Sequence, residues 1–458
     1  MTTPPPLAGG TTGPDALRPL LAVVLDALAE GAAARGGPIP AGGPAAVAAR
    51  MRNVVEPVLP DHGRGAEEAL HTLVREVAHG AADPADPLCA AHLHTPPLAL
   101  AAAADLAASA LNPSMDSWDQ APAASELESA VTRALAAEVY PHGPDPDALV
   151  TTGGTESNHL ALLLARERHG TIQVICGAAA HHSVHRAAWL FGLPEPVTVP
   201  APAGVLDPAA LDEALTDLHG PLLVVATAGT TDTGRIDPLP QIADLTHRHG
   251  AELHIDAAYG GPLLFSDRHR TLLQGLDRAH SVTLDLHKLG WQPIAAGLLA
   301  VPDRAVFTPL GHTAEYLNPT DDTDAGLPDL LGRSLRTTRR PDILKAAVTL
   351  RALGRSGLAE LIDRTRAAAQ QLADLVDKSP RLTLYERPGL TTVLFRPTAA
   401  TDEQTAQIRR TLLDQGRAVL GRARADGRLW LKATLLNPYA TPRDLETLTA
   451  LVEGSTPR

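Results

Sequence analysis

The stretch SVTLDLHKLGWQP, residues 281–293, joins an apolar, strand-like run to a histidine and a lysine. The lysine, Lys288, is one of only four in a chain that holds 39 lysines and arginines. A lysine amine loses its proton readily when it is desolvated and can then bond an aldehyde carbon, whereas an arginine cannot. We therefore expect Lys288, which directly follows His287, to be the attachment point if the protein uses a carbonyl cofactor.

Strand-like and helical patterns alternate around this stretch. The strand-like runs are residues 148–152, 172–176, 222–227, 252–255, 281–284 and 297–301, and the helical patterns include 157–169, 183–190 and 239–249. Such alternation predicts an α/β fold with a mainly parallel, doubly wound sheet and helices on both faces. In these sheets, ligands bind beyond the C-terminal ends of the strands.

The flanking regions have a different pattern and suggest further parts. The expected division is a disordered start and N-terminal helical segment in residues 1–84, a large α/β domain in 85–345 and a small C-terminal α+β domain in 346–458. Within the helical pattern of residues 125–139, Ser125 is followed three residues later by Glu128. That spacing is typical of a capping box and predicts that the helix begins at Ser125.

Composition excludes several classes of function. The chain has 458 residues, a formal net charge of −13 and no Lys/Arg-rich run, which argues against binding to nucleic acid or anionic membranes. The N-terminus has no signal-peptide pattern, and no apolar run is long enough to span a membrane. Two cysteines make no disulfide framework, so we expect a cytoplasmic protein.

A glycine-rich motif, TTGGTESN at residues 151–158, follows one strand-like run and opens a helix. Gly153 and Gly154 let backbone N–H groups approach an anion, the helix N-terminus favours negative charge, and Thr155 adds a hydroxyl donor. The motif fits a phosphate, although an ordinary strand-to-helix turn would have a similar sequence.

Histidines gather just before another helix. His181 could lie flat against a cofactor ring, or it could simply occupy a solvated helix end. A metal site involving His182 and His185 is the third interpretation, and we expect none because no carboxylate or cysteine lies at ligand spacing.

The motif HIDAAYGG, residues 254–261, places Asp256 at the end of an apolar run. A carboxylate there can pair with a protonated ring nitrogen, although such a residue is often only a helix cap. The small Ala258 leaves room for a planar ring. Together with Lys288 and the other motifs, Asp256 meets the needs of pyridoxal 5'-phosphate (PLP): a phosphate cradle, a stacking ring, a carboxylate and an amine.

As an ordered set, these motifs resemble the group II PLP-dependent amino-acid decarboxylases of fold type I. The motifs are TTGGTESN, AHHS, AGTT, HIDAAYGG and DLHK, and the resemblance extends from about residue 87 to the C-terminus. The segments NPSMDSWDQ at 112–120, SLRTTRR at 334–340 and LKATLLNP at 431–438 are similar to the bacterial L-2,4-diaminobutyrate branch. The resemblance implies a seven-stranded sheet, a small C-terminal domain and a homodimer with shared active sites.

The resemblance also implies individual roles. Lys288 would form a Schiff base with PLP, Asp256 would pair with the ring nitrogen, and His181 and Ala258 would contact the two ring faces. The other expected cofactor contacts are Gly153, Gly154, Thr155, Thr231, Asp285 and His287, with His94 and Thr95 on the substrate side. The expected reaction converts an L-amino acid to its amine through a quinonoid intermediate.

The proton donor and the substrate are less determined. Aromatic-amino-acid decarboxylases carry a loop tyrosine that is absent near residues 329–331, so Tyr316, His182, Lys288 or water could donate the proton. Without that tyrosine, oxidative deamination to an aldehyde, or transamination, is the alternative outcome. The best candidate substrate is L-2,4-diaminobutyrate or a similar polar amino acid, which an acidic loop at residues 321–324 could attract unless those carboxylates are merely solvated.

Overall fold

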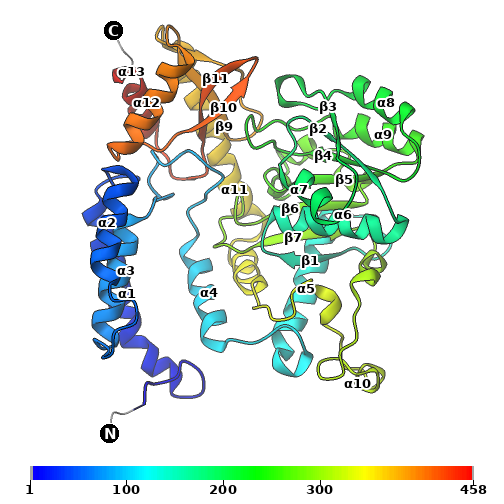
Figure 1. Cartoon of the computed structure of the whole chain (residues 1–458), viewed down its shortest axis with the longest axis horizontal. Helices are drawn as coiled ribbons and strands as arrows, with labels where there is room; N and C mark the ends of the chain where they lie inside the picture. The colour runs from blue at the N-terminus through cyan, green and yellow to red at the C-terminus, as the bar shows by residue number, and fades with distance from the viewer. Residues whose placement is uncertain (1–3, 456–458) are drawn as a thin grey trace. The chain divides into compact units, whose positions relative to one another are not determined.

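A computed structural model of the chain describes residues 4–455 (Figure 1). The chain divides into two compact units, which are described separately. Unit 1 comprises Met1–Pro96, Ala367–Arg387 and Val393–Arg458, and unit 2 comprises Pro97–Arg366 and Pro388–Thr392. The three-part division expected from the sequence stays a prediction; the compact units place most of its first and last parts together in unit 1.

Unit 2 is built on a seven-stranded sheet with the order β1-β7-β6-β5-β4-β2-β3. Its strands are β1 (Asp147–Thr151), β2 (Gln173–Gly177), β3 (Val197–Val199), β4 (Leu222–Thr227), β5 (Glu252–Ala257), β6 (Ser281–Asp285) and β7 (Gly297–Val301). Strands β3, β2, β4, β5 and β6 are mutually parallel, whereas β7 runs antiparallel to both β1 and β6. The predicted mainly parallel α/β sheet is therefore confirmed.

Both faces of this sheet are covered. Every residue of β1, β4, β6 and β7 is buried, which requires packing against both sides because successive side chains point to opposite faces. Its helices are α4 (Ala99–Leu111), α5 (Pro122–Val139), α6 (Gly154–His169), α7 (Ser183–Leu190), α8 (Pro208–Asp217), α9 (Leu239–His249), α10 (Thr320–Asp324) and the first part of α11 (Ile343–Lys378). Short 3-10 turns are η1 (Trp118–Gln120), η2 (Pro202–Gly204), η3 (Gly261–Phe265), η4 (Arg270–Leu273), η5 (Leu276–Arg278), η6 (Arg304–Leu310) and η7 (Leu331–Arg333).

The start of α5 differs from the prediction. The helix begins at Pro122, and Ser125 lies inside it, where its hydroxyl donates to the carbonyls of Ala121 (2.8 Å) and Pro122 (2.9 Å). Glu128 forms a bidentate ion pair with Arg339 instead of reaching back to the helix end, with distances of 2.6 and 2.7 Å. The capping-box prediction was wrong because Pro, which is pre-set for the first helical turn, begins the helix earlier.

The Glu128–Arg339 pair gives a testable stability prediction. Both side chains are at most 4% exposed, so Glu128→Ala leaves a buried, unpaired guanidinium and is expected to lower the free energy of unfolding by about 3–5 kcal/mol. Denaturant titration measures the change. Glu360→Ala is the matched control, because its pair with Arg364 is more than half exposed and should cost less than about 1 kcal/mol. Equal losses in the two variants would contradict the prediction.

Unit 1 combines helices with a second sheet of order β10-β11-β9-β8. Its elements are α1 (Gly13–Arg35), α2 (Gly43–Val55), α3 (Ala66–Gly80), the end of α11, β8 (Leu382–Leu384), β9 (Thr392–Pro397), α12 (Asp402–Asp414), β10 (Gly421–Ala425), β11 (Arg428–Thr434) and α13 (Pro442–Gly454). Gly31 allows α1 to approach α3 closely, since a Cβ there would lie 2.4 Å from the Arg75 carbonyl oxygen. The predicted α+β character of the C-terminal region is confirmed.

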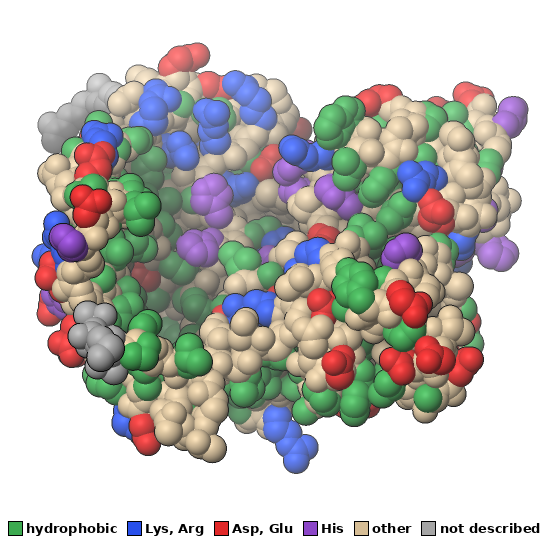
Figure 2. Space-filling view, turned by 60° about the horizontal axis from the view of Figure 1, so that its bottom comes forward, with side chains coloured by type: hydrophobic (Ala, Val, Ile, Leu, Met, Phe, Trp, Pro, Cys, Tyr) green, Lys and Arg blue, Asp and Glu red, His purple; other side chains and the backbone are tan. Residues whose placement is uncertain are grey.

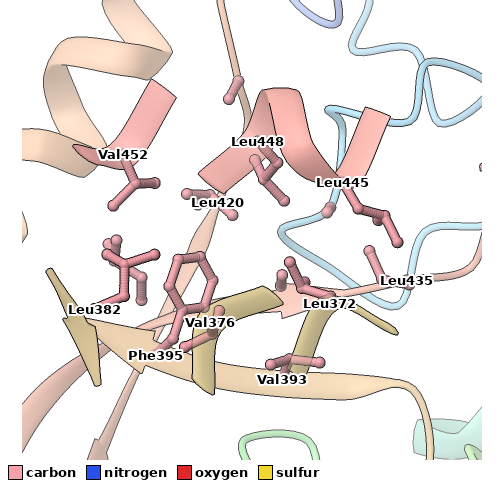
Figure 3. Close-up of a cluster of buried hydrophobic side chains, with 14 of the residues drawn as sticks. Leu372, Val376, Leu382, Val393, Phe395, Leu420, Leu435, Leu445, Leu448 and Val452 are labelled. Carbon is pink, nitrogen blue, oxygen red and sulfur yellow. The ribbon is translucent and has the colours of Figure 1, made fainter. Parts of the chain in front are cut away.

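The core of unit 1 is shown in Figure 3. Side chains from α11, β8, β9 and α13 point toward one another around Phe395, which is fully buried. Residues far apart in sequence also meet in this unit. The backbone N–H of Gly42 donates to the carbonyl of Asp414. The N–H of Ala90 donates to the carbonyl of Val419, and the carbonyl of Ala90 accepts from the N–H of Thr434. Unit 1 therefore requires both ends of the chain.

Charges of both signs are interspersed on the face shown in Figure 2. Among the described helices, none is both long and apolar enough to cross a membrane.

Candidate active site

The predicted site residues of unit 2 lie at one edge of the sheet. Strands β4, β5 and β6 are parallel, and the segments that follow them carry Thr231, Ala258 and Lys288. Strand β1 runs in the same direction, because both it and β6 are antiparallel to β7, and it leads into Gly153 and Gly154. Parallel strands end at the same edge, so the motifs converge there although they are far apart in sequence.

The Lys288 amine is paired with a buried carboxylate. Its Nζ lies 2.9 Å from Asp285 Oδ2, and the Asp285 side chain is only 1% exposed. His287 Nε2 lies 3.5 Å from the same oxygen, and burial lowers the pKa of His287 despite this carboxylate. Asp285 therefore fixes the amine at the end of β6.

The two glycines of the first motif bring the backbone against this group. A Cβ at Gly153, whose φ is +152°, would lie 3.0 Å from His287 Cε1. A Cβ at Gly154 would lie 3.0 Å from the Ala258 side chain and 3.2 Å from Asp285 Oδ2. Helix α6 begins at Gly154, so the first N–H groups of the helix open beside these residues. The glycines, Ala258, Asp285 and His287 thus share one small space.

Asp256 lies in β5 and is 6% exposed. Its Oδ1 accepts the backbone N–H of Ala258 at 3.1 Å, and its Oδ2 accepts the side-chain amide of Asn158 at 2.8 Å. Two N–H donors from different elements therefore fix the orientation of this carboxylate.

His181 precedes α7 and is fixed by Ser183. Its Nδ1 lies 2.8 Å from the Ser183 hydroxyl and also accepts the Ser183 backbone N–H at 3.3 Å. Since Nδ1 accepts, the ring proton is on Nε2. Burial lowers the pKa of His181, and the nearby Asp256 carboxylate partly offsets this effect.

His185 faces away from this group. Its Nδ1 lies 3.0 Å from Glu195 Oε1, and its Nε2 lies 3.8 Å from Cys176 Sγ. Burial raises the pKa of the Cys176 thiol to about 11, which leaves the thiol protonated near neutral pH. Within residues 4–455, no three such side chains are placed to hold a metal ion.

Asp237 fixes the turn that carries Thr231. The Asp237 carboxylate accepts the backbone N–H groups of Thr227 (2.7 Å) and Leu206 (2.8 Å). Thr230 is buried and its hydroxyl contacts Thr233, whereas Thr231 is exposed. The turn therefore presents Thr231 and not Thr230 to the surroundings.

The buried carboxyl group of Asp237 is expected to make the free energy of unfolding depend on pH. Burial raises its pKa to about 6, above the value of 3.8 that applies in the unfolded chain. The folded state therefore holds this proton more tightly, and the folding free energy becomes less favourable by about 2 kcal/mol as pH rises from about 4 to 6. The measurement is the unfolding free energy of the wild type and of Asp237→Asn across this range. The difference between the two should change with pH by roughly this amount, and a constant difference would contradict the assignment.

Three predicted residues lie outside the strand-end motifs of unit 2, since His94 and Thr95 are in unit 1 and Tyr316 is in the segment that follows η6. His94 is exposed and Thr95 is buried, with no hydrogen-bond partner for its hydroxyl among the described residues. Both belong to unit 1, so their roles stay predictions. Tyr316 is 80% exposed and lines a pocket of about 270 Å³ with Trp118 and Asp119, whose lining contains none of the strand-end residues.

Two buried polar residues of the site belong to the predicted motifs, but no function was predicted for them from the sequence. Asn158 and His254 are both fully buried and lie directly behind Asp256. A signal for His254 was available, because residues two apart in a strand point to the same face and His254 precedes Asp256 by two. A polar Asn158 on an otherwise buried, apolar helix face was a similar signal.

The residues present fit PLP. Asp285 Oδ1 and His287 Nδ1 are buried and have no hydrogen-bond partner in the described part of the chain, and both lie beside the two glycines. Buried polar atoms are rarely left without partners, so these two favour a bound polar group. The space at Gly153 and Gly154 suits the phosphate, and the Lys288 amine suits the aldehyde.

Comparisons with known proteins agree with this fit. Residues 49–398 match the model of the pyridoxal-dependent decarboxylase conserved domain. The chain is 42% identical to L-2,4-diaminobutyrate decarboxylase of Rhizobium meliloti (strain 1021), covering 84% of this chain and 81% of that protein. It is 33% identical to the enzyme of the same name from Acinetobacter baumannii, covering 85% and 84%.

A solved structure supports the same assignment over nearly the whole length. It is the glutamate decarboxylase domain of diaminobutyrate-pyruvate transaminase and L-2,4-diaminobutyrate decarboxylase from Vibrio parahaemolyticus, with a TM-score of 0.87 and 32% identity, covering 98% of this chain and 97% of that one. The predicted resemblance, enzyme class and cofactor are confirmed. The chain belongs to the pyridoxal-dependent decarboxylase family, the PLP-dependent carboxy-lyases that act on amino acids.

Proposed function

We propose that this protein decarboxylates L-2,4-diaminobutyrate. The observation that carries the proposal is the meeting of the Lys288 amine, the Gly153–Gly154 backbone and the Asp256 carboxylate at one sheet edge. The choice of substrate rests on the two relatives of that name, at 42% and 33% identity over more than four fifths of this chain.

Each site residue has a proposed role toward PLP. When bound, PLP supplies an aldehyde carbon and an electron-withdrawing ring that can accept the electrons of the bond to CO₂. Lys288 would hold the aldehyde, and the carboxylate of Asp256 would hold a proton on the ring nitrogen. His181 and Ala258 would contact the ring faces. Gly153, Gly154, Thr155, Thr231, Asp285 and His287 would contact the rest of the cofactor.

The proton that replaces CO₂ needs a donor. Lys288 Nζ is the donor that we favour among the strand-end residues, because a buried carboxylate 2.9 Å away keeps it in place. Tyr316 and His182 are the other proposed donors. If Tyr316 donates this proton, Tyr316→Phe lowers turnover; unchanged turnover in this variant leaves Lys288 or His182 as the donor.

The test is the identity of the product. PLP-loaded protein is mixed with L-2,4-diaminobutyrate, and separately with L-ornithine, L-lysine and L-glutamate, and the products are identified by mass spectrometry. A product lighter by one CO₂ that keeps both amino groups, formed fastest from L-2,4-diaminobutyrate, is the expected result. An aldehyde or a keto acid would mean oxidative deamination or transamination, and would overturn the proposal.

We further propose a homodimer with shared active sites, in the cytoplasm. Trp189 and Ile294 of unit 2 are 74% and 71% exposed, and we propose that the partner subunit covers them. The two cysteines are unpaired, which suits a reducing compartment. Sedimentation of the wild type and of Ile294→Asp tests the dimer, and cell fractionation tests the compartment. A monomeric wild type would contradict the first proposal.

A further inference from the structure

A closed group of buried polar side chains lies behind Asp256. At its centre is the side-chain amide of Asn158, which comes from α6 and is 0% exposed. Its nitrogen donates to Asp256 Oδ2 at 2.8 Å and to the Ser183 hydroxyl at 2.9 Å. Its oxygen accepts from the Thr283 hydroxyl at 2.8 Å and lies 3.0 Å from His254 Nε2. Both hydrogens and both lone pairs of the amide are used.

The directions of these hydrogen bonds are determined by the chemistry. Because the Asn158 oxygen can only accept, His254 must carry its proton on Nε2, and its Nδ1 then accepts the Ser281 hydroxyl at 2.8 Å. Burial lowers the pKa of His254 to about 4, so this ring is neutral near neutral pH. A neutral ring with one fixed tautomer locks the amide in one orientation.

The same amide also reaches His181. Ser183 accepts from Asn158, so its own hydroxyl hydrogen is free to donate to His181 Nδ1 at 2.8 Å. One nitrogen atom therefore orients two side chains that come from different elements. The bond to Asp256 Oδ2 orients the carboxylate directly, and the bond to the Ser183 hydroxyl orients His181 through that hydroxyl.

We propose that Asn158 is a positioning residue that orients Asp256 and His181 together on the cofactor ring. The inference deepens the proposed function and rests on the roles given there to those two residues. Asn158 itself does not touch the cofactor; it acts through its two partners. His254 and Thr283 both donate to the amide oxygen of Asn158, and this prevents a 180° rotation of the amide that would interchange its nitrogen and oxygen.

The test compares cofactor binding by the full-length wild type, Asn158→Ala and Tyr259→Phe. Tyr259→Phe is the matched control, because it removes a buried hydroxyl that bonds Thr391 (2.7 Å) and Thr392 (3.0 Å) in the same unit and has no contact with Asp256 among the hydrogen bonds described. PLP is titrated into each apo-protein, and binding is followed by the absorbance and visible circular dichroism of the bound cofactor. Melting temperatures of the apo-proteins report the purely structural cost.

Asn158→Ala is expected to bind PLP about 10- to 100-fold more weakly than the wild type, since a hydrogen bond to a charged group is lost. Its dichroism and the pH profile of its absorbance should also change, because Asp256 keeps only the Ala258 N–H as a donor and the Ser183 hydroxyl that contacts His181 loses the Asn158 amide that orients it. Tyr259→Phe should stay within about twofold of the wild type in affinity, at a similar loss of melting temperature. An Asn158→Ala protein with wild-type affinity and spectra would overturn the inference.

Ser183→Ala covers the case in which Asn158→Ala fails to fold. It removes only the link to His181, so a change in dichroism with a smaller loss of affinity is expected, and an unchanged spectrum would overturn the inference. Failure of the proposed function is seen separately. If the wild type bound PLP but formed no amine, the proposed reaction would fail while the positioning role could still be measured.

Discussion

Replacing Lys288 by alanine should lower turnover by at least about 10⁴-fold, the scale seen when a covalent catalytic group is removed. The Lys288 amine lies 2.9 Å from Asp285 at the end of β6, whereas the buried amine of Lys345 is paired with Asp105 and Asp342. The second readout is chemical. Borohydride treatment of the PLP-loaded wild type should add the reduced cofactor to the peptide that contains Lys288, and that mass should be absent in Lys288→Ala.

Lys378→Ala is the matched control for this experiment. Lys378 is exposed at the end of α11, so its removal should leave both turnover and the labelled peptide unchanged. A Lys288→Ala protein that kept full activity, or label found on Lys378, would remove the basis for the assigned attachment point.

The second large effect is expected for Asp256→Asn. The substitution keeps the shape of the side chain but removes the charge that would hold a proton on the ring nitrogen, and turnover should fall by on the order of 10²–10³-fold. An amide also cannot accept from both the Ala258 N–H and Asn158 without turning its NH₂ group toward one of these donors. Steady-state rates with saturating PLP measure the loss and separate it from weaker cofactor binding.

Asp212→Asn is the control for the loss of a carboxylate. Asp212 is a partly exposed residue of α8 whose Oδ1 lies 2.7 Å from His249 Nε2, and its replacement should leave turnover within about twofold of the wild type. Equal effects of the two substitutions would mean that Asp256 has no special role in the reaction.

Much of unit 2 could be predicted from the sequence because its elements are long and regular. Residues 297–301 and 239–249 were predicted with the observed bounds of β7 and α9. A fully buried strand is a continuous apolar run, and helices between such runs show a clear period. The order of the strands was not predicted, because the motifs at their ends indicate only that those ends share one edge of the sheet.

Short or locally ambiguous elements were missed. The three-residue strands β3 and β8 are too short to show a period, and β10 alternates arginines with small residues that carry little apolar signal. Helix α2 follows a Gly/Pro-rich loop, and none of its residues is buried, so it lacks a marked apolar face. In each case the stabilising contacts are tertiary and cannot be seen in a local window of sequence.

The sequence predicts functional groups at the ends of the strands, but it gives no role to the buried polar side chains behind them. Lys288 and Asp256 carry chemistry that few other functions need, and this made them visible. Asn158 and His254 lie 96 positions apart in the sequence, and the hydrogen bond between them is a tertiary contact that no local sequence pattern specifies. Such partners become apparent only when α6 and β5 are brought together.

The discontinuous composition of unit 1 has a consequence for synthesis on the ribosome. Residues 1–96 emerge first, but Ala90 and Gly42 find their backbone partners only in residues 414–434. At about 5–20 residues per second, the intervening chain takes on the order of tens of seconds to translate. During that interval Ala90 and Leu88 lack the core side chains that surround them in the folded unit, which makes the nascent N-terminal segment a natural client for chaperones.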